Sequence, residues 1–365
     1  MNFTIPRDAL IKPLNLVAGV VERRQTLPIL SNVLLRVEGN RLELTGTDLE
    51  VELLGRVDLA EPGEAGEITV PARKLVDICK SLPEGSEINF SVDSGKATVK
   101  AGRSRFTLST LPAADFPTVE SSEGEVSVSL PQSVLKRLID RTGFAMAQQD
   151  VRYYLNGMLL EILGGRLRMV ATDGHRLALC TAQEPVEAGD ASVIIPRKGV
   201  LELARLLEGD GPVTLVIGSN HVRAANLQFT FTSKLVDGKF PEYERVLPKS
   251  PDKSVVGDRQ TLRQAFTRTA ILSNEKYRGV RLKIADDTLE ITANNPEQEQ
   301  AEEVVSVEFQ GDPLEVGFNV SYLLDVLSVL GDEKVRLSLA DAASSALLEE
   351  ADGGDSLYVV MPMRL

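Results

Sequence analysis

The sequence has no tryptophan, only two cysteines, and aromatic residues at only 5% of its 365 positions. Aliphatic side chains must therefore fill its cores. Cys79 and Cys180 each lie in an apolar stretch, so we expect two reduced, buried thiols and a cytoplasmic protein. No apolar run approaches the roughly 18 residues of a membrane span. The first six residues, 1–6, do not have the pattern of a signal peptide.

The scarcity of histidine limits the possible chemistry. His175 and His221 are the only two histidines, and with two cysteines they cannot make a zinc site of ordinary ligand spacing. No Walker loop or dinucleotide fingerprint occurs, and no paired carboxylates suggest a polymerase or nuclease. The segment 172–175 contains the residues of a catalytic dyad, but a turn that carries a binding histidine explains it better. We expect no enzyme, no metal and no cofactor.

What the sequence does contain is a threefold repeat. Four short patterns recur in the same order, at offsets of 122 to 127 residues. The first is 42–48, 167–173 and 289–295; the second is 70–71, 195–196 and 318–319; the third is 5–6, 130–131 and 257–258; the fourth is 115–117 and 239–241. Chance among common helix and strand motifs is the alternative, because identity between copies is low. The repeat predicts three domains of one fold, at 1–124, 125–250 and 251–365.

Each copy predicts the same order of elements. A strand leads into a helix that begins at or near a proline, which is favoured in the first helical turn; alternating strands, a second helix and more strands follow. The fold class is therefore α+β, with two helices and antiparallel sheets per domain. We expect six helices at 6–24, 71–82, 131–148, 196–208, 259–272 and 318–330. Apolar spacing predicts buried helix faces at Leu10, Leu14, Val17 and Val21, and at Leu135, Leu138, Ile139 and Thr142.

The net charge of −13 argues at first against nucleic acid, because DNA-binding proteins are usually basic. The charge is unevenly distributed, however. The six expected helices contain 16 basic and 7 acidic residues, a net +9, which leaves −22 for the remainder. A basic surface of helices attracts phosphates without reading bases, and an acidic exterior repels DNA. Solvated helix faces are the alternative explanation, and the sixth helix has no basic residue.

The number of helices sets the size of a possible ring. Twelve helices from two chains, about 10 Å apart, make a circle about 120 Å around, and subtracting a helix diameter leaves a hole of roughly 28 Å, wide enough for a duplex of about 20 Å. Six helices from one chain would not leave enough room. The pattern therefore favours a ring of two chains around duplex DNA.

Several segments resemble one known family. They are 27–32, 171–177, 292–297 and the terminal 358–365, and the similarity extends over the whole chain. The sequence resembles the bacterial DNA polymerase III beta subunits, the replicative sliding clamps. The resemblance implies a clamp fold closed head-to-tail as a homodimeric ring. It also implies a non-catalytic processivity factor of the DNA polymerase III holoenzyme in DNA replication.

The resemblance also implies partners and site residues. The partners would be double-stranded DNA, the polymerase catalytic subunit, a clamp-loader ATPase, and other polymerases and repair proteins that bind through short peptide motifs, with no membrane. A partner-peptide pocket would comprise Leu155, Thr172, Gly174, His175, Arg176, Leu177, Pro241, Arg245, Val246, Val359, Val360, Met361, Pro362, Met363 and Arg364. Flexible methionines and apolar side chains suit a groove for varied peptides, although residues 359–363 alone would more often form an ordinary edge strand.

By the same resemblance, DNA contacts would include Arg24, Arg73, Gln149, Tyr153, Tyr154 and Lys198; a tyrosine pair taken alone would usually be core packing. Ring closure would pair Phe106 and Leu108 with Ile271 and Leu272, and would set Lys74, Arg103 and Arg105 against Glu297, Glu302 and Glu303. Opposite charges at opposite ends suit a contact that closes a ring. The remaining alternative is a repeat-built interaction scaffold that does not encircle DNA.

Overall fold

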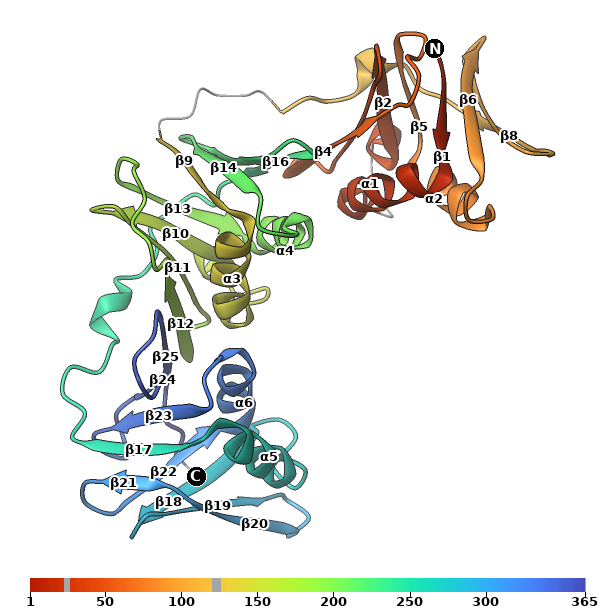
Figure 1. Cartoon of the computed structure of the whole chain (residues 1–365). Helices are drawn as coiled ribbons and strands as arrows, with labels where there is room; N and C mark the ends of the chain where they lie inside the picture. Colours follow the sequence, from red (N-terminus) through yellow and green to blue (C-terminus); the bar gives the residue numbers. More distant parts are fainter. Residues whose placement is uncertain (23–26, 120–125, 365) are drawn as a thin grey trace. The chain divides into compact units, whose positions relative to one another are not determined.

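The computed structural model describes residues 1–22, 27–119 and 126–364. Its elements form two compact units, described here separately. The first unit contains residues 1–135 and 198–235, and the second contains 136–197 and 236–365. Both units combine helices with antiparallel sheets (Figure 1). The predicted α+β class is confirmed.

Six α-helices occur among the described residues. They are α1 (Arg7–Val20), α2 (Ala72–Ser81), α3 (Gln132–Thr142), α4 (Arg197–Leu206), α5 (Arg259–Ala270) and α6 (Val320–Val329). Each lies within its predicted range but is shorter. The helix predicted for 131–148 ends at Thr142 because a 3-10 turn, Gly143–Ala145, follows it. The eight side chains predicted to be buried on the first and third helices are all less than 5% exposed, including Val21, which directly follows α1.

The first unit has two sheets. The four-stranded sheet has the order β1-β6-β7-β8, with β1 (Asn2–Pro6), β6 (Glu87–Asp93), β7 (Lys96–Ala101) and β8 (Ser104–Ser109). The eight-stranded sheet has the order β5-β2-β3-β4-β16-β15-β14-β9, with β2 (Asn32–Glu38), β3 (Arg41–Thr47), β4 (Val51–Asp58), β5 (Gly66–Pro71), β9 (Val126–Pro131), β14 (Pro212–Ile217), β15 (His221–Ala225) and β16 (Phe229–Lys234).

The second unit also has two sheets. The nine-stranded sheet has the order β13-β10-β11-β12-β25-β24-β23-β17-β21. Its strands are β10 (Gly157–Leu163), β11 (Arg166–Thr172), β12 (Arg176–Thr181), β13 (Ala191–Pro196), β17 (Lys253–Asp258), β21 (Glu308–Gln310), β23 (Lys334–Leu339), β24 (Ala346–Glu350) and β25 (Ser356–Val360). The four-stranded sheet β20-β19-β18-β22 contains β18 (Gly279–Ala285), β19 (Thr288–Asn294), β20 (Gln300–Ser306) and β22 (Leu314–Asn319).

The two large sheets run across the junctions between sequence repeats. In the first unit β4, from copy one, pairs with β16, from copy two, and Gly55 lies opposite Phe229. In the second unit β12, from copy two, pairs in the same way with β25, from copy three, and Cys180 lies opposite Ser356. The compact units therefore cut across the repeats, because sheet pairing joins neighbouring copies. The predicted boundary at 124/125 falls outside the described residues.

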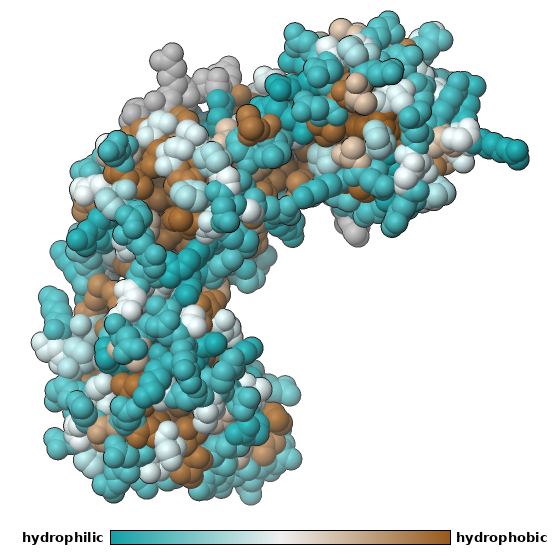
Figure 2. All heavy atoms as spheres, in the orientation of Figure 1, coloured by the Kyte–Doolittle hydropathy of each residue, from teal (hydrophilic) through white to brown (hydrophobic). Residues whose placement is uncertain are grey.

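The cores are aliphatic, as the composition predicts. Leu14, Leu42, Leu44 and Val70 are no more than 1% exposed, and Cys79 and Cys180 are buried free thiols. Burial raises the pKa of each thiol to about 11. Hydrophilic residues cover much of the visible surface, with hydrophobic patches between them (Figure 2). These patches are where partners are to be sought.

Candidate functional site

The C-terminal strand β25 brings together several residues predicted for the partner-peptide groove in the second unit. Along the antiparallel pair β12–β25, Leu177 lies opposite Val359 and Arg176 lies opposite Val360. The chain then continues the pairing, because the Met361 N–H donates to the carbonyl of His175 at 3.0 Å. The Met363 N–H donates to the carbonyl of Gly317 at 2.7 Å. These two hydrogen bonds hold the C-terminal residues after β25 in place. The Met361 side chain is 40% exposed.

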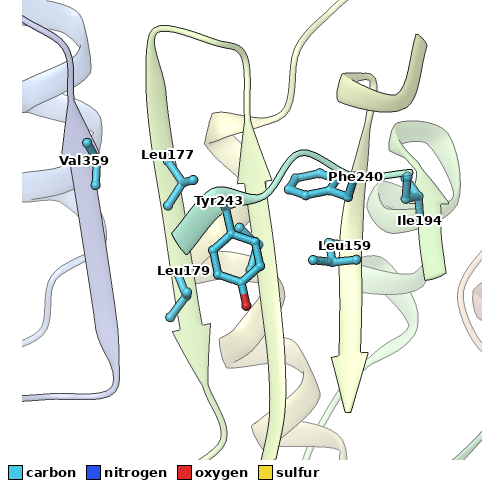
Figure 3. Packing of buried hydrophobic residues seen from close by; sticks show 8 residues of the cluster. Leu159, Leu177, Leu179, Ile194, Phe240, Tyr243 and Val359 are labelled. Carbon is cyan, nitrogen blue, oxygen red and sulfur yellow. The ribbon is translucent and has the colours of Figure 1, made fainter. Parts of the chain in front are cut away.

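A cluster of buried apolar side chains lies beside this predicted groove (Figure 3). Its buried members are Leu159, Val170, Leu177, Leu179, Ile194, Phe240, Tyr243 and Val359, and Tyr154, Val236, Leu247 and Leu347 pack against them. These residues come from strands of copy two, from the segment of copy two that follows its last strand, and from the C-terminal strand. Two predicted pocket residues, Leu177 and Val359, therefore belong to one cluster.

A tight turn shapes the edge of the groove next to β12. The Asp173 carboxylate accepts hydrogen bonds from the N–H groups of His175 and Arg176, at 2.9 and 3.1 Å. The Thr172 hydroxyl donates to the Arg176 carbonyl at 2.6 Å. Gly174 has a φ of +88°, and a Cβ there would lie 2.9 Å from the Arg152 guanidinium. Only glycine fits this position without strain, which explains the Asp-Gly pair in the sequence.

Arg176 is held by its own chain instead of pointing freely into the groove. Its guanidinium donates to Asp173 at 3.1 Å, to the Phe144 carbonyl at 2.9 Å and to Asp325 of α6. It also lies 4.5 Å from the centroid of the Tyr322 ring. The resemblance places Arg176 in the partner-peptide pocket, but its donors are already used within the chain.

The remaining predicted pocket residues differ in exposure. Pro241 and Arg245 are exposed and Val246 is 39% exposed, on the segment that carries Phe240 and Tyr243 into the cluster. Leu155 and Val360 are 2% and 0% exposed, so their side chains are part of the core and cannot contact a peptide directly. His175 and Arg364 are exposed, and Pro362 and Met363 are half-buried. The terminal Leu365 lies outside the described residues.

Sequence reasoning missed several groove residues. Arg152 pairs with Asp150 at 2.9 Å, and Tyr243 donates to Glu161 at 2.7 Å. Burial raises the pKa of Tyr243 to about 12. The sequence around Phe240 and Tyr243 offered a usable signal of burial. Two large aromatic residues close together in a connecting segment with a proline are expected to pack into a hydrophobic core.

The predicted DNA contacts occupy varied surroundings. Arg73 and Gln149 are exposed, and Gln149 has a φ of +55°. Tyr153 is 57% exposed and meets Tyr154 edge-on at 5.9 Å, although Tyr154 also packs on the groove cluster. Lys198 pairs with Glu22 at 2.7 Å and with Asp48. Arg24 lies outside the described residues.

β8 and β20 are edge strands of the two four-stranded sheets, and they carry opposite charge. The β8 edge bears Arg105, with Arg103 just before it, and both are exposed. The β20 edge bears Glu302, which is exposed, and Glu303, which pairs with Arg268 at 2.5 Å. Arg268 donates to Glu303 and lowers its pKa. The other charged residues predicted for ring closure are also basic in the first unit and acidic in the second: Lys74 and Glu297 are both exposed. Phe106, on β8, is half-buried.

Apolar side chains accompany both charged edges. Ile271 is 74% exposed just after α5, Leu272 is half-buried and Val304 on β20 is 60% exposed. Leu108 is 7% exposed on β8. Exposed aliphatic side chains beside an unpaired strand edge are typical of an interface.

The described residues contain no group of three or more histidine, cysteine, aspartate or glutamate side chains arranged to hold a metal ion. Within the same part of the chain, no helix has the length and apolar character needed to cross a membrane.

Three family models match the chain in order. The DNA polymerase III beta subunit N-terminal domain matches residues 1–120, the central domain matches 129–242 and the C-terminal domain matches 244–364. The chain is 69% identical to the beta sliding clamp of Pseudomonas putida and 56% identical to that of Escherichia coli K12, each over 100% of both chains. A solved sliding clamp from Pseudomonas aeruginosa, bound to griselimycin, is 69% identical, with a TM-score of 0.97 and 100% coverage of both chains.

Proposed function

The chain belongs to the DNA polymerase III beta subunit family, and from this premise we propose how its residues carry out the work of a sliding clamp. It encircles duplex DNA as a head-to-tail homodimer and tethers the replicative polymerase, which makes synthesis processive. It is not an enzyme. The protein acts in the cytoplasm, in the DNA polymerase III holoenzyme, and its domains are bounded at 1–124, 125–250 and 251–365.

Sheet topology carries the proposal for ring closure. Inside the chain, β16 pairs with β4 and β25 pairs with β12 at successive repeat junctions. By repeat position β8 is the counterpart of β16, and β20 is the counterpart of β4. Since both strands are edges within their own sheets, β8 of one chain can pair with β20 of the other, which repeats the internal junction a third time. A contact between two different surfaces closes a ring when the rotation is right.

The same correspondence gives a register. The internal junction sets Thr230 opposite Leu54 and Phe231 opposite Leu53. Their counterparts on the free edges are Arg105 opposite Glu302 and Phe106 opposite Ala301. An arginine directly across from a glutamate favours this pairing, while Leu108, Ile271 and Leu272 supply apolar contacts beside it. Lys74 and Arg103, with Glu297 and Glu303, extend the charge complementarity.

DNA is held without base reading. Arg73 and Lys198 contact the duplex from α2 and α4, and Gln149, Tyr153 and Tyr154 from the loop before β10. Arg24, which lies outside the described residues, is a further contact. Lys198 does so while paired with two carboxylates, so its contribution is small. Weak phosphate contacts suit a clamp that must slide, because retention then depends on topology instead of affinity.

The groove beside the C-terminal strand binds the short motifs of partners. The apolar cluster receives their large side chains, and Met361, Met363, Pro241 and Val246 adapt to different sequences. Arg245 and Arg364 meet polar groups of the peptide. The polymerase catalytic subunit, the clamp loader, other polymerases and repair proteins compete for this groove. Arg176, Leu155 and Val360 support it from beneath.

Retention on circular DNA tests the proposal. The clamp is loaded by a clamp-loader ATPase on a nicked circular plasmid and separated from free protein by gel filtration. We expect it to stay on the circle for many minutes and to leave within seconds after a restriction enzyme cuts the plasmid. Equal loss from the circle and from linear DNA of the same length would favour the alternative, a scaffold that does not encircle DNA.

A further inference from the structure

The two helices of copy three offer few free cations to DNA. Helix α6 contains no lysine or arginine. On α5, Arg268 pairs with Glu303 at 2.5 Å, and Arg259 donates to two backbone carbonyls. The remaining cation of α5, Arg263, is exposed. A substantial DNA contact from this copy therefore has to come from outside its helices.

The loop between α5 and β18, residues 271–278, corresponds to the predicted DNA-contact loop of copy two. Each loop joins the first helix of its repeat to the strand that follows, and both lie in the second unit. The Asn156 carbonyl, at the end of the loop before β10, accepts from the N–H of Arg197 at 2.9 Å. The Arg278 carbonyl accepts in the same way from the N–H of Val320 at 2.8 Å. Since Arg197 and Val320 each begin the second helix of a repeat, the two loops end at equivalent positions.

Asn274 fixes the backbone of this loop. Its Oδ1 accepts from the N–H groups of Lys276 and Tyr277, both at 2.9 Å. Its carbonyl accepts from the N–H of Arg278 at 2.8 Å. The Arg278 guanidinium donates in turn to the carbonyl of Ala270, the last residue of α5, at 3.0 Å. These hydrogen bonds tie the turn to the helix before it, so Lys276 and Tyr277 extend from a defined backbone.

The two side chains on this turn are available to a ligand. Tyr277 is 57% exposed. Lys276 is exposed too, and its Nζ lies 5.2 Å from the centroid of the Tyr277 ring. Within the described part of the chain, Lys276 pairs with no carboxylate. Glu275 is the one acid of the segment 273–278, against the two cations Lys276 and Arg278. Lysine and tyrosine side chains both donate hydrogen bonds to the phosphate backbone of DNA.

We propose that Lys276 and Tyr277 form a DNA contact of copy three. Lys276 pairs with a backbone phosphate, and the Tyr277 hydroxyl donates to a phosphate or sugar oxygen beside it. They do for copy three what Tyr153 and Tyr154 do for copy two. The inference rests on the proposed function, because the loop meets DNA only if the ring encloses the duplex. Such a contact reads no bases and is weakened by salt, which suits a protein that slides.

Photocross-linking tests the position of the loop. Tyr277→Cys, Tyr153→Cys and Leu163→Cys each add one accessible thiol, since Cys79 and Cys180 are buried. Each variant is labelled with 4-azidophenacyl bromide, loaded on a nicked circular plasmid and irradiated. Leu163, at the end of β10, is 53% exposed. We expect DNA adducts at position 277 at a yield close to that at 153 and about tenfold above that at 163, because an acidic exterior repels DNA.

The pattern of adducts separates this inference from the clamp function. Adducts at 153 with no more at 277 than at 163 would overturn the contact from copy three and leave the proposed function intact. Background yield at all three positions would overturn both.

Affinity measurements test the two side chains. Lys276→Ala and Tyr277→Ala should each weaken binding to a short duplex at low salt roughly three- to tenfold, measured by fluorescence anisotropy. Lys276→Ala should also reduce the slope of log affinity against log salt by about 1 to 2, since the ring has two copies of the loop. Lys283→Ala, at an exposed lysine on β18, is the matched control and should change neither quantity. Glu275→Gln should tighten binding about twofold, a gain that a folding defect cannot produce.

Dimer stability distinguishes a DNA contact from a contact of the ring interface, because Ile271 belongs to the same loop. Lys276→Ala and Tyr277→Ala should leave the dimer dissociation constant within about twofold of that of the unchanged protein, as expected for surface positions. Analytical ultracentrifugation measures it. Unchanged DNA affinity in both variants, or a loss of affinity that only accompanies a loss of dimer, would overturn the proposal.

Discussion

At the scale of single residues, Arg176 binds several parts of the second unit together. It reaches the turn at Asp173, the carbonyl of Phe144 and the carboxylate of Asp325 on α6, and its side chain is 13% exposed. Such a residue holds together the turn at Asp173, the segment at Phe144 and α6. Its role is therefore one of stability and position.

Replacement of Arg176 by alanine should destabilise the second unit. The change leaves Asp325 and Asp173 without their partner, and losing one member of a mostly buried pair costs about 2–4 kcal/mol. We expect an apparent melting temperature lower by roughly 5–10 °C, measured by differential scanning calorimetry. Arg245→Ala, at an exposed groove arginine, is the matched control and should leave melting unchanged. Identical melting of Arg176→Ala and the unchanged protein would contradict this role.

The two thiols should be silent in the folded protein. Burial raises the pKa of Cys79 and Cys180 to about 11, so at pH 8 only roughly 1 in 1,000 would be thiolate even with free access. Ellman's reagent at pH 8 should detect no reactive thiol in native protein and two after addition of guanidinium chloride. Rapid reaction of either thiol in the native state would show that its core is open.

At the scale of elements, we propose that the free edges of β8 and β20 pair when the ring closes. β8 corresponds to β16 and β25, and β20 corresponds to β4 and β12. These counterparts are paired with each other at the two internal repeat junctions, β4 with β16 and β12 with β25. The chain therefore contains two examples of the strand pairing that we propose between β8 and β20. Opposite charges at Arg105 and Glu302 make this contact specific, since like charges across a strand pair are destabilising.

Reversing one of these charges should weaken the dimer. Arg105→Glu and Glu302→Arg should each raise the dimer dissociation constant about 10- to 100-fold, as measured by analytical ultracentrifugation. Combining both changes should recover much of the loss. Arg166→Glu, an exposed arginine on β11, controls for net charge. If the double variant is no tighter than the single ones, the proposed register is wrong.

Much of this element order could be read from the sequence. The repeat anchors, the prolines before helices and the apolar faces of α1 and α3 predicted the six helices and the α+β class. The partners of charged side chains could not be predicted, because they come from segments far apart in sequence. Lys198 has Glu22 and Asp48 beside it, and Arg176 has Asp325. The burial of Phe240 and Tyr243 in the apolar cluster was missed, although two large apolar residues beside Pro241 were a usable signal.

At the scale of the whole molecule, an acidic protein holds DNA by enclosing it. The net charge of −13 would oppose ordinary binding, and several helix cations are neutralised in the chain, such as Lys12 by Glu208 and Lys136 by Asp140. We therefore expect the affinity for DNA to be low, so that retention depends on the closed ring.

A covalently closed ring provides the most direct measurement. Phe106→Cys and Ala301→Cys, opposite each other in the proposed register, allow both interfaces to be cross-linked after loading on a circular plasmid. We predict that the fully cross-linked clamp stays with the circle in sodium dodecyl sulfate on an agarose gel and is released when the plasmid is cut. If the cross-linked dimer leaves the intact circle in detergent, the duplex does not pass through the ring and the account is wrong.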